Sequence, residues 1–271
     1  MAETDADNGI GVSNGTTQKR NDLLGPDDPP PVGVLNPAGR SAFLLLGDHA
    51  GIAIPAALGT LGLSAQDRAR HIACDIGVQG LGQALAPLLD ATFIHQVYSR
   101  LVVDCNRDPL ADDAIPAVSD GARILGNESI GPVEKAQRVA QIHAPYQQAI
   151  AAEIAHRRVL DQPIVLVSLH SFTPVMAGRA RPWHVGILHG GGDEAFSHAV
   201  LQELSALDRF VVGDNQPYHM DATDHTVPRH AFGAGLAYVE LEIRQDLIGN
   251  VEGQHDWAHI LAKALVAARD N

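Results

Sequence analysis

The segment PIVLVSLH, residues 163–170, carries the pattern that decides the fold. Its apolar run has the length of a strand and ends at a polar pair, His170-Ser171, as expected for a strand in a sheet that is covered on both faces. Three further segments have the same character, namely SAFLLLGD (41–48), PWHVGILH (182–189) and LAYVELEIR (236–244). We predict that all four are strands of one central sheet.

Segments with helical spacing alternate with these strands. They cover residues 63–91, 133–159, 194–207 and 256–268. Ser64 is the predicted N-cap of the first helix, because Asp67 follows three residues later as in a capping box. Residues 91–105 alternate and run apolar, which predicts one or two more strands. The order of elements favours an α/β fold, a three-layer sandwich with a mixed, mainly parallel sheet.

The chain divides into a polar leader and one domain. Its 271 residues are 45% hydrophobic, which is enough for one sizeable core. Residues 1–30 are rich in Asp, Asn, Gly, Thr and Pro and contain almost no apolar clusters, so we predict a flexible leader there. Residues 31–271 are predicted to form a single catalytic domain.

Charge and cysteine content exclude several classes of partner. The formal net charge is −13 and the chain has no basic patch, so neither nucleic acid nor an anionic membrane is an expected partner. Apolar runs stay well short of the roughly 18 residues of a spanning helix. Cys74 and Cys105 form no CxxC pair, and no signal-like segment stands at the start, so we expect a cytoplasmic protein. Oligomeric state cannot be predicted from these features.

Polar residues follow the predicted strands at the points where each strand ends. In sheets of this kind, binding sites lie beyond the carboxyl ends of the strands. The residues selected by this rule are Asp48-His49, Asp104, Asn106-Arg107, His170-Ser171, Glu242 and Arg244. Two histidines, several carboxylates and two arginines together indicate a metal site beside an anion site.

A zinc site suits the histidines in this set. Zinc with three protein ligands and an open fourth position can activate water and polarise a carbonyl group. His49 and His170 each follow a buried strand and form the natural pair. Spacing leaves the third ligand open between Asp75 and His71, four residues apart on the predicted helix, and Asp48, which is disfavoured because adjacent strand residues face opposite ways.

Glu242 is a candidate general base. It lies between Leu241 and Ile243 on an apolar strand, and a buried carboxylate is costly unless it is paired, ligated or used in proton transfer. Arg107 and Arg244 could each bind a carboxylate in bidentate fashion. The structural alternatives are an internal Glu242–Arg244 ion pair and a simple turn at Asn106–Pro109.

Five motifs in order resemble the N-formylglutamate amidohydrolase family. They are GDHAGIAIP, HIACDIG, SRLVVDCNRDP, VSLHSFTP and YVELEIRQDLI, and the resemblance extends from about residue 31 to residue 248. It implies a zinc-carboxypeptidase-like fold, with one Zn²⁺ per chain. The implied reaction is hydrolysis of an N-acyl amino acid, N-formyl-L-glutamate giving glutamate and formate, at the end of histidine breakdown.

The resemblance also implies a role for individual residues. SLHSF is similar to the segment of zinc carboxypeptidases whose histidine binds the metal, which assigns His170. Glu242, within a strand-end E-I-R-Q-D segment, corresponds to their catalytic glutamate. The D-x-N-R stretch implies that Asn106 and Arg107 hold the substrate carboxylate, with Arg244 as a further candidate. Arg100, shortly upstream, is the residue expected to polarise the scissile carbonyl.

One position departs from the wider superfamily. Carboxypeptidases and aspartoacylases carry H-x-x-E with both residues on zinc, whereas the residue three after His49 is Ile52. The formylglutamate family's pattern also lacks that glutamate and carries an aspartate near Asp75, so the third ligand is assigned to Asp75.

Three other functions remain as alternatives. The missing glutamate is consistent with a degenerate, non-catalytic carboxylate-binding protein. A deacylase or carboxypeptidase-like enzyme for another N-acyl amino acid would carry the same residues. A serine hydrolase using Ser168 or Ser171 is poorly supported, because the sequence has no G-x-S-x-G elbow.

Overall fold

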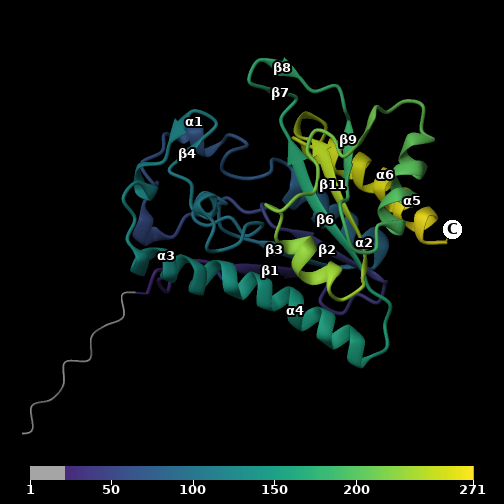
Figure 1. Ribbon diagram of the computed structural model, residues 1–271, viewed down its shortest axis with the longest axis horizontal. Helices are drawn as coiled ribbons and strands as arrows, with labels where there is room; N and C mark the ends of the chain where they lie inside the picture. The colour runs from purple at the N-terminus through teal and green to yellow at the C-terminus, as the bar shows by residue number, and fades with distance from the viewer. Residues whose placement is uncertain (1–21, 271) are drawn as a thin grey trace, which may run out of the picture.

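The computed structural model describes residues 22–270 (Figure 1). A seven-stranded sheet forms its centre, in the order β1 (Val32–Leu35), β3 (Thr92–Gln96), β2 (Phe43–Gly47), β6 (Val165–Phe172), β11 (Ala237–Arg244), β9 (Val185–Leu188) and β10 (Val212–Asp214). Strands β3, β2, β6 and β11 are mutually parallel, while β1 pairs antiparallel with β3 and β9 pairs antiparallel with β11. The predicted α/β fold with a mixed, mainly parallel sheet is confirmed.

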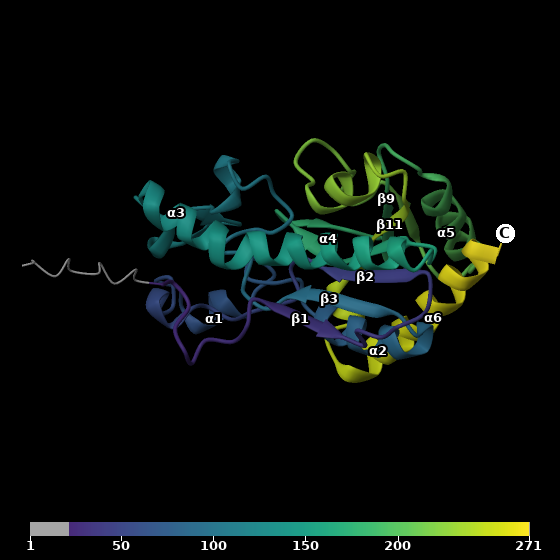
Figure 2. The ribbon, with the colours of Figure 1, turned by 90° about the horizontal axis from the view of Figure 1, so that it is seen from below.

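Helices cover both faces of the sheet. One face packs against α2 (Val78–Leu89), α5 (Ala195–Ser205) and α6 (Val251–Asp270), and the other against α4 (Ala144–Val159). Figure 2 shows α4 along one side of the strands and α2 and α6 along the other. Within β2, Phe43 and Leu45 pack into the core on the side of α2, α5 and α6. Leu44 and Leu46 pack into the core on the side of α4, as strand alternation requires. The result is a three-layer sandwich.

The predicted helix over residues 133–159 is a continuous helical segment with a wider turn inside it. It consists of α3 (Pro132–Arg138), a π-helical turn η4 (Val139–His143) and α4. In contrast, the predicted helix over residues 63–91 is broken. It contains α1 (Ala65–Arg68), which Ser64 caps as predicted by accepting a hydrogen bond from the Asp67 N–H, and then only turns until α2 begins.

Tertiary contacts explain this break, and they correct the prediction that Asp75 lies on a helix. The Asp75 N–H donates to the His49 carbonyl at 2.9 Å, which bends the chain toward the sheet edge. Gly77 follows with φ +88°, and a Cβ there would collide with the Ile248 carbonyl. Asp75 therefore lies in a turn, and its spacing of four from His71 does not place the two on one helical face.

The second half of the predicted strand region 91–105 is a buried loop rather than a strand. Val102 and Val103 lie in the core on the α4 side of the sheet. Arg138 donates to the Val102 carbonyl at 3.0 Å and Asn127 to the Leu101 carbonyl at 2.8 Å. Side chains thus satisfy the carbonyl groups that a neighbouring strand would otherwise have bonded.

Short elements complete the described chain. There are two hairpins, β4 (Val118–Ser119) with β5 (Ala122–Arg123) and β7 (Val175–Met176) with β8 (Arg179–Ala180). The 3-10 helical turns are η1 (Ala56–Leu58), η2 (Asp112–Ala114), η3 (Leu125–Asn127) and η6 (Gln245–Leu247), and η5 (Pro228–Phe232) is a π-helical turn. No helix within residues 22–270 has the length and apolarity needed to cross a membrane.

Packing on the domain begins before residue 31. Leu23 is buried, the Leu24 N–H donates to the Gln141 side chain at 3.0 Å, and the Tyr98 hydroxyl donates to the Pro29 carbonyl at 2.7 Å. The last part of the predicted leader therefore contacts the core. Residues 1–21, to which the rest of that prediction applies, lie outside the described residues.

Candidate metal centre and its cavity

A cavity of about 600 Å³ opens beyond the carboxyl ends of the central strands. His49 follows β2, His170 lies within the end of β6, and Glu242 lies near the end of β11. These three residues line the cavity together with Asp75 and Arg100. Topology therefore gathers at one edge of the sheet residues that are almost 200 positions apart in the sequence.

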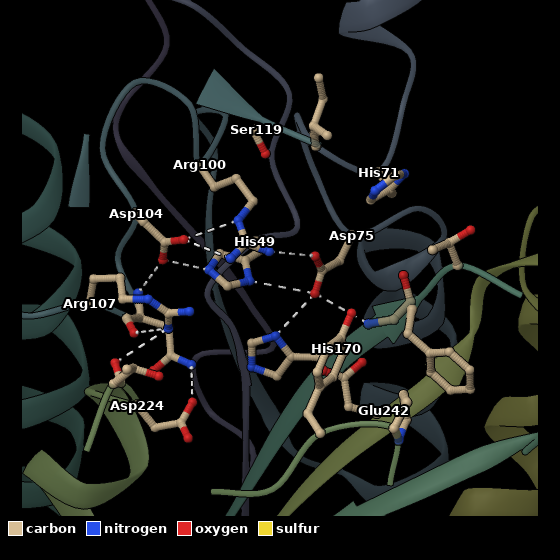
Figure 3. Close-up of a pocket in the computed structure, with 18 of the residues that line it drawn as sticks. His49, His71, Asp75, Arg100, Asp104, Arg107, Ser119, His170, Asp224 and Glu242 are labelled. Atoms are coloured by element: carbon tan, nitrogen blue, oxygen red, sulfur yellow. Dashed lines mark hydrogen bonds and ion pairs between the residues drawn. The ribbon is translucent and has the colours of Figure 1, made fainter. Parts of the chain in front are cut away.

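His49, Asp75 and His170 point toward one another (Figure 3). The Asp75 Oδ2 atom lies 3.0 Å from His170 Nδ1 and 3.5 Å from His49 Nδ1. One ligand atom from each residue lies within 4.8 Å of the other two. Ligands about 2.1 Å from a tetrahedral zinc ion are separated by about 3.4 Å, so this spacing suits such an ion.

The second nitrogen of each imidazole ring is already held by the protein. His49 Nε2 lies 2.7 Å from Asp104 Oδ1, and His170 Nε2 lies 3.1 Å from the Ser168 hydroxyl. Such contacts orient the rings of metal-binding histidines. In contrast, His49 Nδ1 is buried and has no hydrogen-bond partner among the described residues. A zinc ion would give this orphaned atom a partner, so the residues fit the metal that the sequence predicts.

Electrostatics at this cluster favour positive charge. Burial opposes ionisation of Asp75, but His49 and His170 outweigh it and hold its pKa below the usual value. Likewise, burial opposes protonation of His170, but Asp48 and Asp75 raise its pKa well above the ordinary range. Against the effect of burial, Arg100 and His49 likewise hold the pKa of Asp104 well below its usual value. Two carboxylates, Asp75 and Asp104, thus remain ionised around two rings, an arrangement that attracts protons or a metal cation.

The two alternatives for the third ligand lie differently. His71 lines the cavity, but its Nε2 atom is 3.4 Å from Asp120 and it does not belong to the cluster. Asp48 is fully buried behind His170 and accepts a hydrogen bond from the Thr226 hydroxyl at 2.6 Å. Of the three candidates, the structure brings Asp75 to the two histidines.

Two carboxyl groups from β11 point to the cavity side of the sheet. Glu240 and Glu242 are both buried, and they stand opposite Ser168 and His170 of β6. Burial raises the pKa of each to about 8. The Oε2 atom of Glu242 has no hydrogen-bond partner within residues 22–270. Glu242 is therefore a carboxyl group beside the candidate metal site with an atom free to exchange a proton.

Arg100 joins two carboxylates at the cavity wall. Its Nε and Nη2 atoms donate to Asp104 Oδ2 at 3.0 and 2.7 Å, and its Nη1 atom donates to Asp75 Oδ1 at 3.3 Å. Arg100 thereby supports both the candidate ligand Asp75 and the carboxylate that orients His49. Its side chain is about a quarter exposed, so the guanidinium group also faces the cavity.

Asn106 and Arg107 connect the cavity to the segment 221–226. The Asn106 side chain accepts hydrogen bonds from the N–H groups of His225 and Thr226 at 3.0 and 2.9 Å and donates to Asp224 at 3.3 Å. Its amide group thus holds this segment in place. Arg107 donates to Asp113, to the Thr223 carbonyl and to the Asn106 carbonyl, and its side chain lines the cavity.

Arg244 lies apart from the other predicted site residues. It donates to Asp246 at 2.8 and 3.3 Å and to the Trp183 carbonyl at 3.4 Å, and it is not among the residues that line the cavity. The structure therefore brings Asn106 and Arg107 to the cavity but not Arg244. It also shows that Glu242 and Arg244 do not form the internal ion pair considered above, because Arg244 pairs with Asp246.

The two serines near His170 are poorly placed to act as nucleophiles. Ser168 is completely buried and does not line the cavity. Ser171 lines it, but its hydroxyl donates to the Ile76 carbonyl at 3.0 Å. Neither hydroxyl is both exposed to the cavity and activated by a histidine.

Several site residues were not assigned roles from the sequence. Asp104 orients His49, although the sequence marks it only as a strand-end polar residue. Glu240 could have been found from its spacing, because residues two apart on a strand share a face. Tyr218 and His219 line the cavity from a segment without any recognisable motif.

A known protein family matches most of the chain. The profile of the N-formylglutamate amidohydrolase family matches residues 41–249, which is more than half of the chain. The chain belongs to this family. The match to the amidohydrolase family includes every residue predicted for the site, from His49 to Arg244. A comparison with curated proteins gives no match.

Two solved structures resemble this member of the N-formylglutamate amidohydrolase family. A gene product of Agrobacterium tumefaciens is 35% identical, with a TM-score of 0.88 over 92% of this chain and 98% of that one. An N-formylglutamate amidohydrolase from Ralstonia eutropha is 18% identical, with a TM-score of 0.65 over 89% of this chain and 98% of that one. The second likeness shows a shared fold.

Proposed function

We propose that this chain is a zinc-dependent amidohydrolase that cleaves N-formyl-L-glutamate, or a closely related N-acyl amino acid, to the amino acid and a carboxylate. Membership of the N-formylglutamate amidohydrolase family supports the reaction class. The observation that carries the proposal is the convergence of His49 Nδ1, Asp75 Oδ2 and His170 Nδ1, with the other nitrogen of each ring already bound.

His49, Asp75 and His170 would hold the zinc ion. When bound, zinc supplies positive charge that polarises the scissile carbonyl group and lowers the pKa of water. Asp104 and Ser168 keep both rings oriented, and Arg100 keeps Asp104 and Asp75 in place.

Glu242 would act as the proton carrier. Its Oε2 atom accepts a proton from the attacking water as that water adds to the acyl carbon, and it returns the proton to the leaving amine nitrogen. A pKa of about 8 in a buried site is close to the range in which a group can both accept and release a proton near neutral pH. Positive charge at the neighbouring cluster favours the carboxylate form that the first step needs.

Two arginines would bind the substrate, one at its scissile carbonyl group and the other at its carboxylate. The Arg100 guanidinium faces the cavity beside the cluster, where it can stabilise charge that develops on the carbonyl oxygen. Arg107 faces the same cavity and can bind a substrate carboxylate in bidentate fashion, while Asn106 holds the segment against which Arg107 rests. Fixing the carboxylate orients the amide toward Glu242.

The test combines metal content with turnover. Zinc is measured by mass spectrometry on the purified full chain, and formate release from N-formyl-L-glutamate is followed before chelation, after chelation and after zinc is restored. N-acetyl- and N-succinyl-L-glutamate serve as matched substrates that differ only in the acyl group, and release of glutamate, which all three substrates share, is followed for the comparison.

The expected result is formate release that chelation abolishes and zinc restores. Turnover of the acetyl or succinyl substrate above that of the formyl substrate would redirect the proposal to another acyl group. Turnover that survives complete removal of metal, or no turnover of any of the three substrates with zinc bound, would overturn it. The latter outcome would favour a non-catalytic carboxylate-binding protein.

A further inference from the structure

A second cluster of histidine and carboxylate side chains lies outside the cavity. His189 follows directly after β9, Glu194 precedes α5, and His198 lies in the first turns of that helix. Figure 1 shows β9 and α5 at the same end of the molecule. Glu194 and His198 are four residues apart, so they share one side of the α5 N-terminal turn. Gly191 and Gly192 both have positive φ, which allows the chain to turn so that His189 lies close to Glu194 and His198.

Distances within this cluster are those of metal ligands rather than of good hydrogen bonds. The Glu194 Oε2 atom lies 3.4 Å from His189 Nδ1 and 3.5 Å from His198 Nε2. Optimal N–H···O bonds are about 2.7–3.2 Å long, whereas ligands of a tetrahedral zinc ion are about 3.4 Å apart. One ligand atom from each of the three residues lies within 4.8 Å of the other two.

The protein also holds the groups that orient these ligands. His189 Nε2 lies 2.8 Å from Asp214 Oδ1, which leaves Nδ1 directed at Glu194. The other oxygen of Glu194 accepts a hydrogen bond from the Gly191 N–H. This repeats the arrangement around His49, where a carboxylate binds Nε2 and leaves Nδ1 for the cluster.

We propose that His189 Nδ1, Glu194 Oε2 and His198 Nε2 form a second metal site, for a divalent transition-metal ion of the zinc class. Two imidazole nitrogens and one carboxylate oxygen are a donor set that zinc accepts, with a fourth position left for water. The His189 side chain is 11% exposed and the His198 side chain 49%, so the site lies at the surface and exchanges its ion with solvent.

The position of this site predicts a structural effect. His189 also donates its backbone N–H to the Asn215 side chain at 3.0 Å. The chain that continues from Asn215 reaches Pro217 and Tyr218, which line the catalytic cavity. An ion at His189 therefore links the start of α5 to the base of the cavity wall and should raise the thermal stability of the chain by mass action.

The test is a zinc titration of the full chain by equilibrium dialysis, after removal of metal. Four single variants and one double variant are compared with the wild type, and Tm is measured with and without zinc. His198→Ala removes a half-exposed ligand from a helix, and Glu194→Gln keeps the hydrogen bond to Gly191 while replacing the ligand oxygen. His156→Ala is the matched control, because His156 is an exposed histidine on helix α4. His49→Ala removes a ligand of the cavity cluster.

Wild type and His156→Ala should each bind two zinc ions per chain, and His49→Ala should keep the surface ion. His198→Ala should lose one, and Glu194→Gln should bind that ion at least about tenfold more weakly. Zinc should raise Tm in His49→Ala but not in a His49→Ala/His198→Ala double variant. Equal stoichiometry and affinity in wild type and His198→Ala would overturn the proposal. A wild type that binds one ion, lost only in His198→Ala, would support this site and contradict the cavity site.

Discussion

Replacing Glu242 with Gln should make the enzyme less active and its metal-free form more stable. The substitution keeps the shape of a side chain that is only 7% exposed, and it removes one carboxyl group whose Oε2 atom has no hydrogen-bond partner among the described residues. If Glu242 carries the proton, turnover of N-formyl-L-glutamate should fall by about 10²–10⁴-fold. Zinc binding should persist, because Glu242 is not one of the candidate ligands.

The gain in stability follows from the pKa of the buried carboxyl group. Burial raises that pKa to about 8, from 4.5 for an exposed glutamate. At pH 7 folding therefore requires a proton that the unfolded chain does not hold, which costs about 1.4 kcal/mol per pH unit, or on the order of 3 kcal/mol. Glutamine avoids this cost.

The pH dependence has a defined sign. Because the folded-state pKa is raised, the stability contributed by the protonated Glu242 is complete below about pH 4.5 and is lost as the pH rises to about 8. The Gln variant lacks this loss, so its advantage over the wild type should be small at about pH 5 and largest at about pH 8.

The assay is urea unfolding of chelated protein across this pH range, alongside steady-state kinetics of the zinc-loaded protein. Glu240→Gln is the comparison variant, because Glu240 is also buried on the same strand but stands opposite Ser168 rather than His170. It should gain similar stability and lose less than about tenfold in turnover. A Glu242→Gln variant that keeps turnover within tenfold of wild type, or that is less stable at about pH 8, would refute the reasoning.

Three further substitutions test the site and the core. Asp75→Asn should weaken zinc binding in the cavity by about a hundredfold, measured by competition with a chelating dye, and unchanged affinity would remove Asp75 from the ligand set. Arg107→Lys should raise KM for N-formyl-L-glutamate about tenfold with kcat little changed, because lysine cannot bind a carboxylate in bidentate fashion; an unaltered KM would contradict this role. Arg157 is fully buried and donates to Glu153 and to the carbonyl groups of residues 41–43. Arg157→Met should therefore lower the free energy of unfolding, measured in urea, by about 3–5 kcal/mol, and a decrease below about 1 kcal/mol would contradict this.

Much of the fold could be predicted from local patterns. The runs that became β2, β6, β9 and β11 are short and apolar, and segments with helical spacing alternate with them. The rule that binding sites lie beyond the carboxyl ends of the strands then selected His49 and His170, which the structure does bring together. Their roles as ligands, like the other assigned roles, stay predictions until metal is measured.

The remaining features depend on contacts that are distant in sequence. The helix predicted through Asp75 is interrupted because the backbone bonds to His49 and because Gly77 packs against Ile248. Arg244 shares a strand with Glu242, but Asp246, two residues beyond it, is the nearer partner. A single sequence shows neither the distant contacts nor whether Arg244 pairs with Glu242 or with Asp246.

The place of β11 in the sheet affects how the chain folds while it is being synthesised. This strand pairs with β6 on one side and β9 on the other, yet it spans residues 237–244, near the end of the described chain. While the ribosome is still adding those residues, β6 and β9 have no partner between them and present unpaired backbone edges. Nascent chains at that stage should be more prone to aggregation than the finished domain. Activity should appear only once β11 has inserted, because Glu242 arrives with it.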